Sequence, residues 1–411
     1  MNIDRKCRHC AAPLTLSLAD LGVTPVANDY VSEEDFFKAE PFYSLHVFVC
    51  SDCRLAQIDD ILQSDELFRE DYAYFSSVSS SWLEHARTYV SRMIERFGLD
   101  EQSTFVEVAS NDGYLLQYVK KAGIRAVGIE PCQSVADVAI EKGIETQVAF
   151  FGEEAAQKLK DKGVRADAMA ANNVLAHVPD INDFVKGFKI LLAEQGVATF
   201  EQQHLLQLMQ QKQFDTIYHE HYSYLSLLAA QRLFAAAGLR VFDVEHLSSH
   251  GGSLRLFVCH NSASHKETDA VVATLREEKD YGLDEDAVYE SWARDVREAK
   301  RNFLSMLVDL KREGASIAAY GAPAKGNTLL NYCGIGLDFI DFTVDRAESK
   351  QGKYLPGSRL PILHPDEIMS AKPDYIVILP WNLKDEIMSQ MAGVRAWGGK
   401  FIVPIPEPEI L

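Results

Sequence analysis

The chain has 411 residues, of which 47% are hydrophobic and 25% charged; this is the composition of a globular protein, and the length suits two or three domains. Its net charge of −19 repels phosphate backbones and anionic membrane surfaces, which argues against nucleic acid or a membrane as a partner. No apolar run approaches the roughly 18 residues of a membrane span, and no apolar signal stretch opens the chain, so a cytoplasmic protein is expected.

The N-terminal segment holds four of the seven cysteines in two CxxC pairs, Cys7 with Cys10 and Cys50 with Cys53. Each pair presents two thiolates on one tight turn, and four thiolates complete the tetrahedral sphere of Zn²⁺ without an open position. The segment therefore predicts a structural zinc site. The alternatives are four unrelated thiols or a redox dithiol, although one CxxC would suffice for the latter and no thioredoxin-like unit surrounds either pair.

Residues 104–130 have the pattern of a strand, a glycine-containing loop, a helix and a second strand. The first strand ends at Glu107, the loop runs from Ala109 to Gly113, and the second strand ends at Glu130. An acid about 20 residues after such a loop is placed to accept both hydroxyls of a ribose in a doubly wound α/β fold. The loop lacks GxGxxG and instead resembles the first motif of S-adenosylmethionine-dependent methyltransferases. An acid that ends a strand merely for solvation is the alternative.

Two further strands are expected within 166–178 and 196–203, with a helix between them. Asn172, Asn173 and His177 follow the first of these strands, where open α/β sheets bind their ligands. A helix-capping or core histidine is an equally good interpretation of His177 by position alone.

The stretch "FDTIYHEHYSYLS", residues 214–226, concentrates protonatable side chains. In a helix, Tyr218 and His221 would share one face; in an extended loop, Tyr218 and Glu220 would align, opposite His219 and His221. The spacing excludes an HExxH protease site. General acid/base catalysis is indicated, because histidine titrates near neutrality and tyrosine can relay a proton. A second metal on the two histidines and a polar hydrogen-bonded loop are the alternatives.

In the C-terminal third, a hairpin is expected at 239–260 and a long helical region at about 266–312. The segment "SIAAYGAPAKGNTLLNY" then predicts a strand, a loop and a helix whose N-terminus, with Gly321 and Lys325, suits a diphosphate, although it is not a Walker A loop. Lysines gathered at strand ends of an acidic protein also indicate an anionic ligand. A Rossmann-like interaction domain without a ligand is the alternative.

Together these motifs resemble the nucleotide-sugar C-methyltransferase family, whose members include the enzyme that makes the branched sugar tetronitrose. The resemblance spans the whole chain in order. Besides the two CxxC pairs it rests on "LGVTPVANDY" (21–30), "DYAYFSSVSSSWLEHA" (71–86), "EVASNDGYLL" (107–116), "NNVLAHV" (172–178), "FDTIYHEHYSYLS" (214–226) and "YGAPAKGNTLLNY" (320–332). It implies an α/β protein with a zinc-binding domain (1–70), a Rossmann-like methyltransferase domain (71–262) and a second Rossmann-like domain that binds a nucleotide sugar (263–411).

The resemblance also implies the reaction, methylation of a ring carbon, typically C3, of a 4-keto deoxysugar linked to a nucleoside diphosphate. The family's Y-x-E-H run matches Tyr218, Glu220 and His221, and its histidine after the fourth strand matches His177. His219 receives no role. His221 or Tyr218 would be the base that forms an enolate, His177 the donor to its oxygen, and Glu220 the group that sets the tautomer of its partner.

The remaining expectations concern binding, and a monomer is favoured. S-adenosylmethionine is expected to contact Tyr74, Phe75, Glu107, Ala109, Asn111, Gly113, Glu130, Pro131, Asn172 and Asn173. The sugar nucleotide is expected to contact Ser76, Ser79, Lys325, Asn327, Lys350, Lys353, Trp381 and Asn382. A sugar O-methyltransferase and a non-catalytic zinc-ribbon binding protein are the alternative functions.

Overall fold

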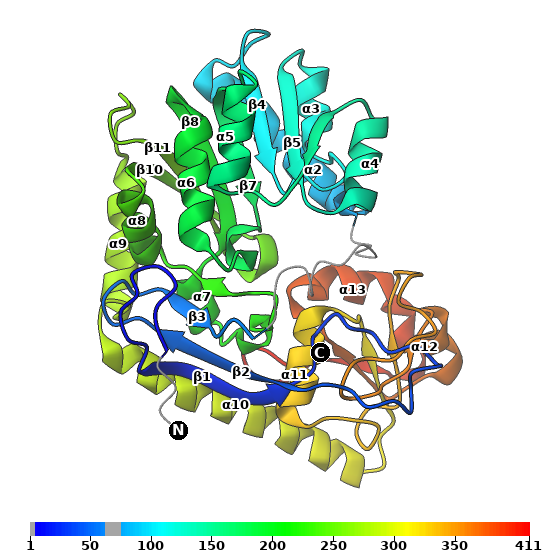
Figure 1. The fold of residues 1–411 in the computed structure, drawn as a ribbon. Coiled ribbons are helices and arrows are strands. Elements are labelled where there is room, and N and C mark those ends of the chain that lie inside the picture. The colour runs from blue at the N-terminus through cyan, green and yellow to red at the C-terminus, as the bar shows by residue number, and fades with distance from the viewer. Residues whose placement is uncertain (1–4, 62–74) are drawn as a thin grey trace.

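The computed structural model describes residues 5–61 and 75–411, and the strands of these residues form three sheets (Figure 1). The antiparallel N-terminal sheet has the order β1-β2-β3-β9. Its strands are β1 (Leu16–Thr24), β2 (Tyr43–Val49), β3 (Ala56–Ile58) and β9 (Ser223–Tyr224). The last strand comes from the stretch rich in histidine and tyrosine, far downstream in the chain.

The second sheet has seven strands in the order β10-β11-β8-β7-β4-β5-β6. Its parallel part is made by β4 (Thr104–Val108), β5 (Arg125–Glu130), β6 (Glu145–Val148), β7 (Ala166–Asn172) and β8 (Leu192–Gln203). An antiparallel hairpin of β10 (Leu239–Leu247) and β11 (Ser253–His260) extends it beside β8. The helices of this region are α2 (Ser80–Phe97), α3 (Leu116–Lys121), α4 (Gln133–Glu141), α5 (Glu153–Asp161), α6 (Ile181–Leu191), α7 (Leu205–Gln210), α8 (Leu227–Ala236) and α9 (Asp269–Tyr281).

The C-terminal sheet has the order β14-β13-β12-β15-β16-β17, parallel except for its last strand. Its strands are β12 (Ile317–Tyr320), β13 (Thr343–Val344), β14 (Ile362–Leu363), β15 (Tyr375–Ile378), β16 (Lys400–Val403) and β17 (Glu409–Ile410). Its helices are α11 (Ala324–Cys333), α12 (Asp366–Ala371) and α13 (Lys384–Gln390). The predicted α/β class with a second Rossmann-like sheet is confirmed.

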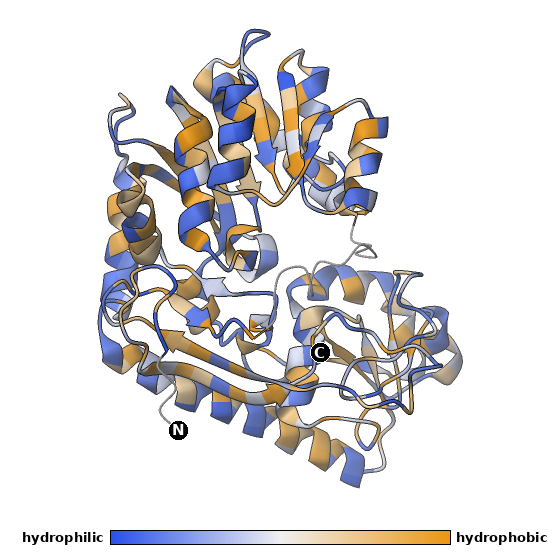
Figure 2. Ribbon diagram, viewed as in Figure 1, coloured by the Kyte–Doolittle hydropathy of each residue, from blue (hydrophilic) through white to orange (hydrophobic). Residues whose placement is uncertain are grey.

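Helix α10 (Asp286–Arg312) joins the N-terminal and C-terminal sheets, running along β1 in Figure 1. Figure 2 shows mixed hydrophobic and hydrophilic residues along α10 and mainly hydrophobic ones along β1 and β2. The apolar positions of the helix recur every three or four residues, which places one stripe against the sheet. Trp292 and Phe303 of that stripe share one core with Val47 of β2 and Leu330 of α11.

Two element boundaries differ from the sequence expectations. The helical region at 266–312 is two helices, because Gly282 adopts φ of 99° and ends α9 in the left-handed conformation. Strand β8 begins at Leu192 rather than at 196, immediately after α6. Within the described part of the chain, no helix is long and apolar enough to cross a membrane.

Candidate active site

The four cysteines of the two CxxC pairs come together, with their Sγ atoms all within 4.8 Å of one another. The two CxxC pairs form the same turn, in which the residue after the second cysteine donates its amide to the carbonyl of the first cysteine. Ala11 N–H donates to Cys7 O and Arg54 N–H to Cys50 O, each at 2.9 Å. Four convergent thiolates at this spacing fit a tetrahedral Zn²⁺ ion and leave no ligand position for a substrate.

The zinc knuckles also fix the strand that holds the histidine-rich stretch. Gln57 of β3 donates from Nε2 to Cys7 Sγ at 3.2 Å and accepts at Oε1 from the Arg8 amide at 2.8 Å. The same strand pairs with β9, where Gln57 lies opposite Ser223. Metal site, strand and histidine-rich stretch are therefore one continuous structure.

The loop after β4 turns sharply at the carboxyl end of the parallel strands. Ala109, Asn111 and Gly113 all have positive φ, and a Cβ at Gly113 would lie 2.4 Å from the side chain of Ile144. Glu130 ends the neighbouring strand and accepts from the amides of Asn111 and Cys132, each at 3.0 Å. Burial raises the pKa of Glu130. A carboxylate has about four acceptor positions, so ribose hydroxyls can still bind beside these amides.

Other expected cofactor residues surround this loop. Asn172 donates to the Tyr114 hydroxyl at 3.4 Å, and Asn173 has a positive φ of 53° at the end of β7. The Ser76 amide donates to the Asn111 side chain at 2.8 Å, which brings the residues next to Phe75 onto the loop. Pro131 directly follows Glu130. Glu107 is buried within β4, and burial raises its pKa well above the ordinary range. Tyr74 lies outside the described residues.

The histidine-rich stretch begins with a short 3-10 helix (Phe214–Thr216) and ends in β9. Between them, residues 218–221 form a turn closed by the His221 amide, which donates to Tyr218 O at 2.9 Å. The turn brings Tyr218 Oη within 2.8 Å of His221 Nε2. Nδ1 of the same imidazole donates to Thr216 O at 2.8 Å, so Nε2 is the acceptor of the tyrosine hydroxyl. Burial lowers the pKa of His221 well below its ordinary value, and the imidazole is therefore neutral at pH 7.

His177 lies beside this pair, with its ring centroid 4.7 Å from that of His221. Its Nδ1 donates to the backbone carbonyl of Glu220 at 2.7 Å. Burial lowers the pKa of His177 to about 4. Two neutral imidazoles and one tyrosine hydroxyl thus lie together as a compact group of proton donors and acceptors, which we call the acid/base cluster (His177, Tyr218 and His221).

The carboxylate of Glu220 does not set a histidine tautomer as expected. Its two oxygens accept from Asn28 Nδ2 at 3.0 and 2.7 Å, while backbone carbonyls orient both imidazoles of the cluster. Burial raises the pKa of Glu220 to about 7, opposed by the bond from Asn28. His219 points toward β2 and donates to Ser44 O at 3.2 Å, so it does not fit a metal site shared with His221.

The C-terminal sheet contributes the expected residues at one edge of the same region. Lys325 Nζ lies 3.0 Å from Asn382 Oδ1 and 4.6 Å from the centre of the Trp381 ring. Trp381 Nε1 donates to Asp215 at 2.6 Å, and burial raises the pKa of Asp215 to about 6. The histidine-rich stretch is thus tied to the C-terminal domain as well as to the zinc-binding one.

The other expected substrate residues have partners within the protein or are exposed, and Lys350 contacts the loop that leads into α11. Lys350 donates to Ala322 O at 2.9 Å, Lys353 is exposed, and Ser79 caps α2 by accepting from the Trp82 amide at 3.3 Å. Asn327 is buried and donates to Ala27 O at 2.6 Å, which makes it a link to the N-terminal segment.

Several residues of this region were missed by the sequence analysis. They are Asn28, Thr216, Asp215, Glu201, His85 and His250. Asn28, His85 and Asp215 lie inside the quoted motifs, so the motifs themselves were the available signal. Thr216 acts through its backbone, which no residue pattern reveals.

Comparison with known proteins finds three family profiles in chain order. They are described as "Putative zinc binding domain" (residues 7–68), "Methyltransferase domain" (82–244) and "C-methyltransferase C-terminal domain" (248–406). The C-methyltransferase NovU of Streptomyces niveus is 36% identical over 406 residues, 99% of this chain and 96% of NovU.

Solved structures are more distant. A SAM-dependent methyltransferase from Anabaena variabilis matches with a TM-score of 0.39 at 12% identity, covering 50% of this chain and all of that one. Magnesium protoporphyrin IX methyltransferase from Synechocystis matches with a TM-score of 0.35 at 11% identity, covering 48% of this chain and 89% of that one.

Proposed function

Because the chain belongs to the C-methyltransferase family and is an S-adenosylmethionine-dependent enzyme, we propose that it methylates C3 of a 4-keto deoxysugar linked to a nucleoside diphosphate. Transfer of a methyl group to carbon sets aside the O-methyltransferase and non-catalytic alternatives. The domain boundaries at 70 and 262 remain part of the proposal, with the addition that residues 223–224 join the N-terminal sheet.

The acid/base cluster is the observation that carries this proposal. A sugar carbon becomes a nucleophile only when a neighbouring ketone acidifies its C–H bond, so the enzyme needs a base and a donor to the enolate oxygen. His221, with its Nδ1 proton held by Thr216 O, presents Nε2 as a basic atom 2.8 Å from Tyr218 Oη. We assign the C–H proton to His221, directly or through the Tyr218 hydroxyl, and assign the enolate oxygen to His177.

The cofactor supplies the methyl group on a sulfonium centre. The residues proposed to hold it are the loop from Ala109 to Gly113, Glu130 at the ribose, and Asn172 and Asn173 at the end of β7. In support, three residues of positive φ let the backbone of this loop approach a ligand, and the buried Glu130 accepts from the Asn111 amide of the loop.

The C-terminal domain is proposed to bind the sugar nucleotide. Lys325 in the first turn of α11, together with Lys350, gives positive charge and a helix N-terminus for a diphosphate. Trp381 and Asn382 adjoin Lys325 and would contact the same ligand.

The test uses thymidine-diphospho-4-keto-6-deoxyglucose in deuterated water, with and without S-adenosylmethionine. We expect one carbon-bound methyl group with the cofactor and deuterium incorporation without it. A ketone acidifies the C–H bonds at both C3 and C5, so NMR of the exchanged position tests the assignment to C3. Methylation of thymidine-diphosphoglucose, which has a hydroxyl in place of the ketone, would contradict the enolate mechanism.

A further inference from the structure

A second buried network lies beside the acid/base cluster, centred on the carboxylate of Glu201 near the end of β8. The side chain is fully buried and accepts from His85 Nε2 at 2.8 Å, Arg255 Nη2 at 2.7 Å and Ser249 Oγ at 2.9 Å. Its backbone carbonyl accepts from the Asn173 amide at 2.7 Å. The carboxylate of Glu201 thus joins α2, β11 and the turn between β10 and β11, and its backbone carbonyl joins the end of β7.

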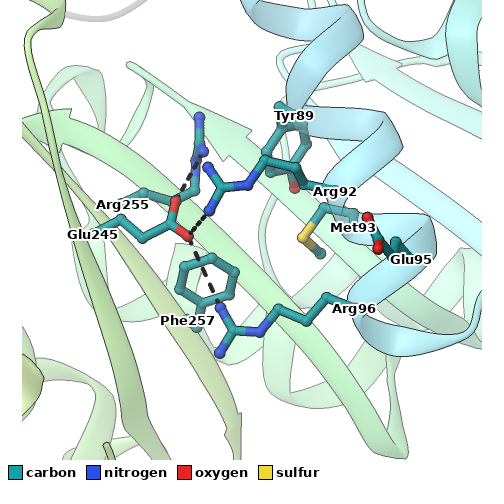
Figure 3. A pocket seen from close by; sticks show the side chains of 8 residues that line it. All are labelled: Tyr89, Arg92, Met93, Glu95, Arg96, Glu245, Arg255 and Phe257. Atoms are coloured by element: carbon teal, nitrogen blue, oxygen red, sulfur yellow. Dashed lines mark hydrogen bonds and ion pairs between the residues drawn. The ribbon is translucent and has the colours of Figure 1, made fainter. Parts of the chain in front are cut away.

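Arg255 is held on its other side by a second acid, Glu245. It lies opposite Glu201 on β11 and reaches Glu245 with Nη1 at 3.2 Å. Figure 3 shows this side, a pocket of about 280 Å³ in which Arg92 and Arg96 also approach Glu245. Because these arginines already share the carboxylates of Glu245 and Asp243, the pocket has no strong excess of positive charge for an anion. The bond from Arg255 to Glu245 in this pocket instead holds the guanidinium in place beside Glu201.

The turn that Ser249 anchors has a costly backbone conformation. His250 has φ of 53°, a left-handed value that is uncommon for a histidine, and Gly251 and Gly252 continue with φ of 87° and 119°. Such conformations persist only where the surrounding contacts impose them, and they gather at functional sites. Here the bond from Ser249 to Glu201 is one of those contacts.

Other contacts place this turn against the residues of the proposed reaction. Gln213, which precedes the histidine-rich stretch, donates from Nε2 to Gly251 O at 2.7 Å. A Cβ at Gly251 would lie 2.7 Å from the Trp381 ring. His250 is exposed, and a charge on it would lower the pKa of both His177 and His221. Gln213 and Trp381 thus place the turn that carries His250 against the start of the histidine-rich stretch.

We propose that Glu201 is a positioning residue of the methyl-transfer reaction, which through Ser249 holds the turn of residues 249–252, and with it His250, at the substrate beside the acid/base cluster. This inference rests on the proposed function. The desolvation of a buried carboxylate and arginine offsets most of their attraction, so such a pair stabilises a fold less than apolar packing does. A buried pair next to reacting groups is therefore better explained by a positioning role.

The fold offers a matched control for this role. Glu278 is also a fully enclosed glutamate bonded to a histidine, accepting from His204 Nε2 at 2.7 Å and from the Leu228 amide at 2.8 Å. It caps α8 through the amides of Leu227 and Leu228. Among the described residues its side chain makes no hydrogen bond to residues 249–252, and only the backbone amide of its partner His204 reaches that turn, donating to Gly252 O at 3.1 Å. Glu278→Gln therefore replaces a buried, histidine-bonded carboxylate while leaving the bonds of Ser249 and Asn173 to Glu201 in place.

The experiment compares the full-length zinc-loaded enzyme with Glu201→Gln, Ser249→Ala, Ser249→Thr and Glu278→Gln. We expect Glu201→Gln to slow both deuterium exchange into thymidine-diphospho-4-keto-6-deoxyglucose and kcat by about 10–100-fold, since small misplacements of reacting groups cost this much. Ser249→Ala removes one hydrogen bond and should slow both by about 3–10-fold, with recovery in Ser249→Thr. Glu278→Gln should lower the melting temperature while keeping kcat.

Three outcomes would overturn the proposal. Glu201→Gln and Ser249→Ala could keep the parent kcat, or Glu201→Gln could lose no more activity than Glu278→Gln at equal loss of stability. Weaker S-adenosylmethionine binding with unchanged exchange would instead place its action at the cofactor, through the stack of His85 on Trp82. If the parent methylates the sugar without any exchange, the enolate mechanism fails, and the kcat comparison of Glu201→Gln with Glu278→Gln still decides the positioning role.

Discussion

The cofactor loop and the acid/base cluster lie in one protein but are assembled in different ways. The loop is closed by neighbours in sequence, such as Glu130 and Asn111, which are 19 positions apart. The turn of the cluster is closed from a distance, with Asn28 bonded to Glu220 across 192 positions and Trp381 to Asp215 across 166. Local structure can thus form the cofactor site, whereas the cluster exists only when three domains are docked.

This difference predicts that the two sites fail separately. Damage to the zinc-binding domain or to the C-terminal domain should disturb proton transfer and leave the cofactor site intact. Substitutions at the carboxyl ends of β4 and β5 should do the reverse.

The largest effect is expected from removing the zinc ligands. Cys7→Ser combined with Cys10→Ser should abolish zinc binding, which contributes on the order of 10 kcal/mol in small zinc domains, and should lower solubility. Strand β3 then loses its support and β9 its partner, so turnover should fall below detection. Metal analysis and calorimetry with S-adenosylmethionine check this; loss of cofactor affinity together with turnover would show that the two sites are not separable.

The next largest effect concerns the cluster itself. His221→Asn and Tyr218→Phe should each slow turnover by roughly 10²–10⁴-fold, the usual cost of losing a principal acid/base group, with unchanged cofactor affinity. At least one of them should also abolish deuterium exchange into the ketosugar. Full rates in both single variants and in the double variant would contradict the assignment and leave the turn as a packed polar loop.

The same difference explains what the sequence could predict. The strand, loop and helix around Glu107, Gly113 and Glu130 follow from patterns within a few tens of residues, and the structure has them in order. The metal site could also be predicted from the two cysteine pairs, because two closely spaced CxxC pairs are typical ligands of structural zinc.

The residues of the acid/base cluster could be predicted from the sequence, but the turn that brings them together could not. The residues between 214 and 226 fit a helix and an extended loop equally, and the observed turn depends on Asn28, on β3 and on Thr328, which donates to Ile217 O at 2.9 Å across 111 positions. The Y-x-E-H run implies a role for Glu220 at a histidine, and nothing in that run points to its observed partner Asn28, which is 192 positions away. The break at Gly282 had a local signal, a glycine in a long helical pattern.

A smaller effect is expected in the cofactor site. Glu130→Ala should weaken S-adenosylmethionine binding by roughly 1.5–3 kcal/mol, the value of hydrogen bonds to a charged group. Deuterium exchange into the ketosugar needs no cofactor and should keep the parent rate, which is the converse of the result expected for His221→Asn. Unchanged affinity in calorimetry would show that Glu130 does not hold the ribose.

The smallest effect follows from the buried Glu220, whose pKa is raised from about 4.5 to about 7. The folded protein therefore keeps the Glu220 proton up to a higher pH than the unfolded chain does. The contribution of Glu220 to the free energy of unfolding accordingly falls as pH rises from about 4.5 to about 7. Between pH 6 and pH 8 the loss should be about 1 kcal/mol. Glu220→Gln cannot ionise and does not share this loss. Its free energy of unfolding should therefore increase relative to that of the parent by about 1 kcal/mol between pH 6 and pH 8, as measured in paired urea titrations. The difference between variant and parent isolates Glu220 from Asp215, whose raised pKa of about 6 is common to both. If the free energies of unfolding of variant and parent change in parallel with pH, Glu220 is ionised throughout, and the bond from Asn28 outweighs the effect of burial. If the pH-dependent difference also appears when both proteins carry Cys7→Ser and Cys10→Ser and bind no zinc, the turn keeps its structure without the N-terminal sheet.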